Sequence, residues 1–100
     1  MFYQKHIFFC TNQKPAGNGC GDFSGESGFN FAKLYLQGLD LWGEGKLRAS
    51  KSGCLGRCVV GPVCVIYPDG IWYSYVDEKD VREIIDQHLI QNQIVMRLQV

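Results

Sequence analysis

Four of the five cysteines in this chain lie in two glycine-rich segments that are far apart in the sequence. The first segment holds Cys10 and Cys20, and the second holds Cys54 and Cys58. Cysteine binds metals as a thiolate, and four thiolates suit either a tetrahedral zinc ion or an iron–sulfur cluster. The chain must therefore fold so that two distant segments meet, and a bound metal centre is the leading interpretation.

The remaining composition is that of an ordinary globular domain. With 100 residues, 46% of them hydrophobic, the chain is long enough for one core. We therefore expect residues 1–100 to form a single domain, with a tail at 91–100. Ten acidic and ten basic side chains balance, and no basic run interrupts them. This pattern predicts neither nucleic acid nor membrane as a partner.

The beginning of the chain does not look like an export signal, because its apolar run at 7–9 is too short. We therefore expect a cytoplasmic protein, in which thiols stay reduced. Five is also an odd number of cysteines, which disfavours a disulfide scaffold.

Alternating and β-branched runs predict strands at 5–10, 46–50, 63–67 and 71–76, with a Pro-Asp-Gly turn joining the last two. The third strand contains Cys64, which we expect to pack in the core as a small apolar side chain.

Helical periodicity predicts two helices. The first is capped by Ser24 or Ser27 and runs to about Asp40, with Gly43 and Gly45 as terminators. Its expected apolar stripe is Ala32, Tyr35, Leu36 and Leu39. The second is capped by Asp77, and its expected inner positions are Val81, Ile84, Ile85, His88 and Leu89.

The resulting order is β-α-β-β-β-α. A first β-α-β unit with parallel strands and a right-handed crossover places both cysteine segments at the same end of the sheet. The carboxyl ends of such strands are where α/β sheets place their sites.

The spacing of the cysteines favours iron over zinc. Cys54 and Cys58 fit a zinc knuckle, but nine residues separate Cys10 from Cys20, which is too wide for one. A two-iron cluster gives each iron its own ligand pair, and glycine-rich backbone can approach its sulfides. A Rieske centre needs two histidine ligands, whereas we expect isolated histidines at 6 and 88 to be structural.

These residues carry a resemblance. Cys-Thr-Asn at 10–12, Gly-Cys-Leu-Gly-Arg-Cys-x-x-Gly-Pro at 53–62 and Val-x-Tyr-Pro-Asp-Gly-x-Trp-Tyr at 65–73 resemble the thioredoxin-like [2Fe–2S] ferredoxins. The same fold occurs in the small iron–sulfur subunit of NADH:quinone oxidoreductases. The resemblance implies an α/β, thioredoxin-like fold with a four-stranded mixed sheet of order 4-3-1-2, whose third strand is antiparallel to the rest. It also implies a [2Fe–2S] cluster held by Cys10, Cys20, Cys54 and Cys58.

Two further features have alternatives that the sequence leaves open. Arg57 lies between two expected ligands, where it either offsets cluster charge, meets a partner or is an ordinary surface residue. The strand at 71–76 is expected to be outermost and lacks protecting lysine or proline. It is expected either to pair with a second copy, giving a homodimer, or to be covered by residues 94–100. Trp42, Trp72, Tyr73 and Tyr75 are expected to fill the core and this edge.

No nucleophile–base motif, phosphate loop or dinucleotide fingerprint is present, so we do not expect an enzyme. The expected function is a soluble one-electron carrier that serves redox partner proteins of unknown identity. The alternative is a structural or cluster-handling iron–sulfur or zinc module, or a subunit of a larger redox complex.

Overall fold

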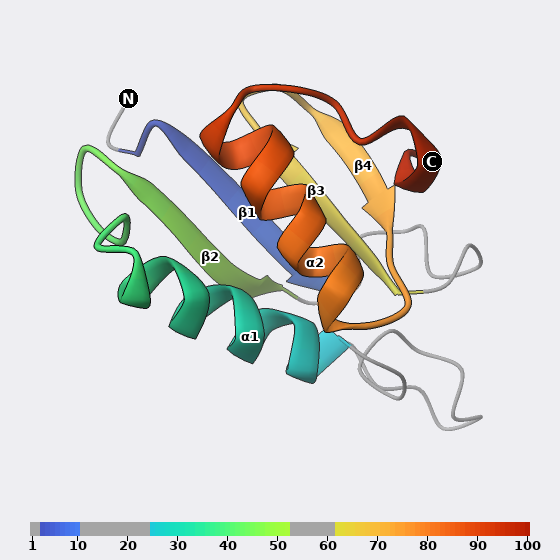
Figure 1. The fold of residues 1–100 in the computed structure, drawn as a ribbon, viewed down its shortest axis with the longest axis horizontal. Coiled ribbons are helices and arrows are strands. Elements are labelled where there is room, and N and C mark those ends of the chain that lie inside the picture. The colour runs from blue at the N-terminus through green and yellow to red at the C-terminus, as the bar shows by residue number, and fades with distance from the viewer. Residues whose placement is uncertain (1–2, 11–24, 53–61) are drawn as a thin grey trace.

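The computed structural model describes residues 3–10, 25–52 and 62–100. A four-stranded sheet carries two helices, which lie on the same face of the sheet (Figure 1). The strands are β1 (Lys5–Cys10), β2 (Leu47–Ser52), β3 (Val63–Tyr67) and β4 (Ile71–Ser74). The helical segments are α1 (Gly25–Gly38), α2 (Glu78–Ile84), its π-helical continuation η3 (Ile85–Ile90) and a 3₁₀ turn η4 (Met96–Leu98).

The strand order is β2-β1-β3-β4, which is the order 4-3-1-2 read from the other edge. β1 and β2 are parallel, with Cys10 opposite Ser52 at their carboxyl ends. β3 is antiparallel to both β1 and β4. The α/β, thioredoxin-like fold class expected from the sequence is therefore confirmed.

The start and end of α1 differ from the expectation. Ser27 lies inside the helix, so it is not the cap, and Ser24 lies outside the described residues. The helix ends at Gly38 because Asp40 adopts a left-handed φ of 58°. Two backbone bonds then close the end as a Schellman motif: the amide of Leu41 donates to Leu36 O, and that of Asp40 donates to Gln37 O.

Gly43 and Gly45 consequently lie in the following turn, with φ of 121° and 74°, and do not end the helix. Leu39 falls beyond the last helical turn and is 44% exposed, so its place in the expected stripe was wrong. Ala32 and Leu36 are buried as expected.

The second helix follows the expectation closely. Oδ1 of Asp77 accepts a hydrogen bond from the amide of Asp80 at 3.2 Å, which satisfies an amide at the beginning of α2. All the expected inner positions are buried: Val81, Ile84, Ile85, His88 and Leu89.

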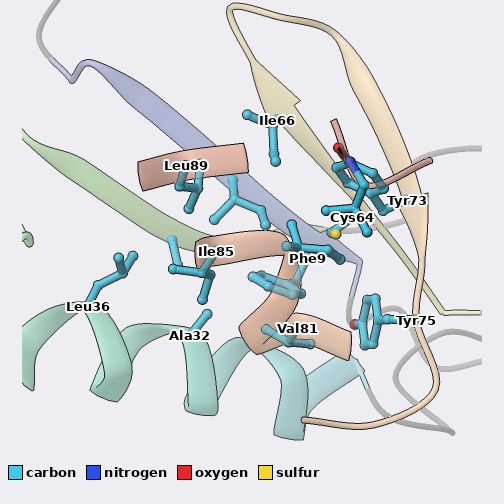
Figure 2. Packing of buried hydrophobic residues seen from close by; sticks show 14 of the residues in the cluster. Phe9, Ala32, Leu36, Cys64, Ile66, Tyr73, Tyr75, Val81, Ile85 and Leu89 are labelled. Carbon is cyan, nitrogen blue, oxygen red and sulfur yellow. Dashed lines mark hydrogen bonds between the residues drawn. The ribbon is translucent and has the colours of Figure 1, made fainter. Parts of the chain in front are cut away.

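The sheet separates two groups of buried side chains. The main core lies between the sheet and the helices and includes Phe9 and Tyr73 (Figure 2). Neighbouring residues of a strand point to opposite faces, so Cys10 and Trp72 lie on the face that the helices leave uncovered. There Cys10 and Val63 are fully buried, and the partly buried Trp72 packs against them.

The last ten residues, 91–100, run along β4, which is the outermost strand as expected. Val95 and Leu98 are buried in the main core, and Gln99 forms an antiparallel bridge with Tyr73. The amide of Val100 donates to Trp72 O at 3.1 Å. The expected cover of the outer edge by this tail is therefore present over the middle of β4.

Candidate metal centre

Cys10 occupies the end of a central strand, where three strand ends meet. It is the last residue of β1 and lies opposite Ser52, the last residue of β2. On its other side β3 begins at Val63, one residue before the partner of Phe9. The hydroxyl of Ser52 also donates to Phe9 O at 3.4 Å, which ties the two strand ends together.

Both cysteine segments are anchored at this end of the sheet. The first leaves β1 after Cys10 and enters α1 at Gly25, whose start lies near the tips of β1 and β2 (Figure 1). The second leaves β2 after Ser52 and rejoins the described chain at Pro62, whose carbonyl accepts a bond from Tyr75. The described residues that flank the two segments therefore meet at one end of the sheet, as expected. Cys20, Cys54 and Cys58 themselves, and Arg57, lie outside the described residues.

Cys64 is unsuited to be a ligand. Its thiol is fully buried on the helix-covered face of the sheet, among the main core residues. Burial raises the pKa of this thiol far above its ordinary value, so it stays protonated and apolar. The expected role of Cys64 in core packing is confirmed.

The two histidines have structural roles, as expected. Nε2 of His6 lies 2.8 Å from Oγ of Ser50, and its ring stacks on Phe8. Burial, followed by the nearby charge of Arg48, lowers the pKa of His6. Among residues 3–10, 25–52 and 62–100, no three His, Cys, Asp or Glu side chains gather as metal ligands would.

His88 belongs to a buried polar network that no sequence motif predicted. The Tyr73 hydroxyl lies 2.7 Å from Nδ1 of His88, while Nε2 of His88 contacts Oδ2 of Asp69. Burial alone would raise the pKa of Asp69, but hydrogen bonds from Lys5 and His88 outweigh it and lower that pKa. Lys5 begins β1 and Cys10 ends it, so the network and the cysteine anchors lie at opposite ends of the strand.

Trp72 is the residue at this end whose position the sequence did not resolve. The alternation of residues along β4 predicted only that Trp72 fills the core or the sheet edge. It could not predict which residues of β3 and β1 lie next to Trp72. In the structure Trp72 packs against the buried cluster that Cys10 and Val63 form. Only the combined register of β1, β3 and β4 brings these three residues together.

In the part of the chain that the structure describes, no helix has both the length and the apolar character needed to cross a membrane.

The curated proteins that are similar to this chain include two 2Fe-2S ferredoxins. No family model matches the chain. It is 32% identical over 96 residues to a 2Fe-2S ferredoxin of Clostridium pasteurianum, which covers 95% of this chain and 94% of the relative. It is 31% identical to a 2Fe-2S ferredoxin of Aquifex aeolicus, over 94% of this chain and 86% of the relative.

Solved structures show the same similarity in three dimensions. The crystal structure of the wild-type thioredoxin-like [2Fe-2S] ferredoxin from Aquifex aeolicus superposes with a TM-score of 0.85 at 31% identity, covering 96% of this chain and 95% of that one. The fold of this chain agrees with that of the solved ferredoxin, and the sequence identity extends over nearly the whole length of both. The chain belongs to the thioredoxin-like [2Fe-2S] ferredoxins.

Proposed function

We propose that this protein carries single electrons on a [2Fe–2S] cluster. The proposed ligands are Cys10, Cys20, Cys54 and Cys58. The observation that carries the proposal is the position of Cys10, buried at the end of β1 between the end of β2 and the beginning of β3. The relatives support it, since two that match nearly the whole chain are 2Fe-2S ferredoxins.

The reach of the chain is compatible with this ligand set. Parallel strands lie about 4.8 Å apart, and each residue spans at most about 3.6 Å. Cys54 follows Ser52 by two residues, so its Cα lies within about 12 Å of that of Cys10. Two cysteine side chains and a metal centre between them can span such a distance. Cys58 precedes Pro62 by four residues, a reach of at most about 14 Å.

The chemistry of the donor set fits the cluster. Four thiolates are the ligands that a [2Fe–2S] cluster requires, and the cluster when bound supplies reversible one-electron transfer. The protein residues hold it, limit water at Cys10 through Val63 and Trp72, and keep the fifth thiol, Cys64, protonated inside the core. We propose that the chain is a carrier and not an enzyme, because it has no catalytic motif beside these ligands.

The proposed partners are redox proteins, and the proposed compartment is the cytoplasm, where thiols are reduced and free to bind iron. We further propose that two copies pair. Val76 beyond the end of β4 and Met96 in the tail are 78% and 82% exposed. Within the described residues, the tail pairs only with the middle of β4, at Trp72 and Tyr73, and large exposed apolar side chains near it are typical of an interface.

Pairing is tested by sedimentation of the holo-protein. Val76→Glu combined with Met96→Glu is expected to shift a dimer to monomer. Leu34→Glu is the matched control, since Leu34 is 68% exposed on α1. A wild-type monomer at micromolar concentration would contradict the proposal.

The electron-carrier function is tested on protein purified without oxygen. We expect red-brown visible absorption, two irons and two sulfides per chain, and a reversible one-electron wave in voltammetry. A colourless protein with one zinc per chain would overturn the proposal in favour of a structural zinc module.

A further inference from the structure

We propose that Trp72, together with Val63, forms an apolar shield over Cys10 that keeps water from the metal centre and thereby sets its reduction potential. This inference rests on the proposed function, because it takes Cys10 as a ligand. It concerns a residue that neither the ligand motif nor the sequence periodicity assigned to the centre.

The shield is a separate structure from the main core. The sheet lies between them: Phe9 and Tyr73 face the helices, while Cys10 and Trp72 lie on the uncovered face. No described helix covers that face (Figure 1), yet Cys10 and Val63 have no exposed surface. Trp72, with one of the largest apolar side chains available, packs directly on this pair.

The backbone on both sides of Trp72 fixes its position. On its inner side β4 pairs with β3, where Trp72 lies opposite Val65. On the outer side its carbonyl accepts the amide of Val100 at 3.1 Å. The neighbouring bridge between Tyr73 and Gln99 continues this contact. The end of the tail therefore helps to hold Trp72 in place. It does so from the outer edge of β4, whereas Cys10 lies two strands away on β1.

The physical consequence concerns the charge of the reduced state. Reduction adds one negative charge at the centre, and water stabilises added charge better than an indole ring does. The apolar shell around a metal site controls both solvent access and local dielectric, and hence the potential. Removing the shield is therefore expected to raise the reduction potential and to open Cys10 to water.

The test uses two holo-protein variants that make the shield polar. Trp72→Gln removes the ring and places an amide against the cluster of Cys10 and Val63. Val63→Thr replaces a methyl by a hydroxyl with little change of side-chain shape. Both are expected to shift the potential upward in protein-film voltammetry. Both should also increase the exchangeable-deuteron signal around the reduced centre in pulsed electron paramagnetic resonance after transfer to D₂O.

The rate at which a chelator removes the metal centre is a third measurement. We expect it to be at least about tenfold faster in Trp72→Gln, because local opening controls access to the ligand. Trp72→Phe retains an apolar ring and should stay near wild type. Trp42→Phe is the matched control, since Trp42 is also partly buried but packs on the main core beside Arg48. It should leave all three readings unchanged.

The outcomes separate the two proposals. If the wild type shows the [2Fe–2S] spectrum while Trp72→Gln and Val63→Thr keep its potential and deuteron signal, the shield is refuted and the carrier function stands. If the wild type holds no such centre, the carrier function fails first and the shield falls with it. If Trp72→Gln does not fold, Val63→Thr decides the question alone.

Discussion

Replacing Tyr73 by phenylalanine tests whether the buried polar network holds the tail on the sheet. The Tyr73 hydroxyl lies 2.7 Å from Nδ1 of His88 and accepts the amide of Val95 at 3.0 Å. Val95 is 2% exposed and His88 is 1% exposed, so neither can turn to bulk water when the hydroxyl is gone.

The expected cost follows from these two contacts. Leaving one buried polar group unsatisfied costs about 1–3 kcal/mol. Two such groups, with some relaxation of the tail, give a loss of about 2–4 kcal/mol in the free energy of unfolding. For a domain of about 100 residues this lowers the melting temperature by roughly 10–25 °C.

Tyr35→Phe is the matched control, because it removes the same atom from a more open place. The Tyr35 hydroxyl donates to Asp86 at 2.6 Å beside solvent, so its loss should cost about 0.5–1.5 kcal/mol. Denaturant midpoints of both variants are compared with wild type in anaerobic holo-protein, together with hydrogen exchange at the Val95 amide. That amide should exchange at least about tenfold faster in Tyr73→Phe. Equal midpoints for the two variants, with Val95 protected as in wild type, would refute this account of the network.

Two further predictions follow from local geometry and charge. Gly28→Ala should destabilise the protein by about 1–3 kcal/mol, since a Cβ there would lie 2.9 Å from the Tyr75 ring; Gly38→Ala, with nothing within 4 Å, should be neutral or slightly stabilising in the same melts. Burial alone would raise the pKa of Asp80, but hydrogen bonds from Arg97 and from the Val76 amide outweigh it and lower that pKa below its unfolded value near 4. The stabilisation by Asp80 is therefore complete above about pH 4 and lost as pH falls through the lower folded value, so the stability difference between wild type and Asp80→Asn should shrink on acidification. A difference that stays constant between pH 6 and pH 3 would show that Asp80 is not stabilised as a carboxylate.

The sequence predicted the fold well where periodicity and cap chemistry agree. β1 and β3 were predicted at their observed bounds, and Asp77 caps α2 as expected. The end of α1 was missed because the rule looks for glycine in the left-handed position, whereas Asp40 occupies it here. The short reach of β4 was missed as well: the apolar run continues to Val76, but the strand ends at Ser74.

The candidate site could be predicted only in part. Cysteine spacing identified four candidate ligands and the strand end that carries Cys10, and the burial of Cys64 agrees with its exclusion. The packing of Trp72 against the cluster of Cys10 and Val63 could not be predicted, because it depends on the register of β1, β3 and β4. These strands are neighbours in the sheet, but β2 lies between β1 and β3 in the chain. The network of Tyr73, His88 and Asp69 could not be predicted either, because its members come from a strand, a helix and a turn that only the fold brings together.

The most direct test of the central claim is the electron paramagnetic resonance of the reduced protein with its cysteines replaced one at a time. Serine at position 10, 20, 54 or 58 should alter or abolish the [2Fe–2S] signal, since each would change a ligand. Cys64→Ala keeps an apolar side chain in the core and should leave the signal of the wild type unchanged. A signal that survives unaltered in Cys10→Ser, or one that disappears in a folded Cys64→Ala protein, would contradict the account.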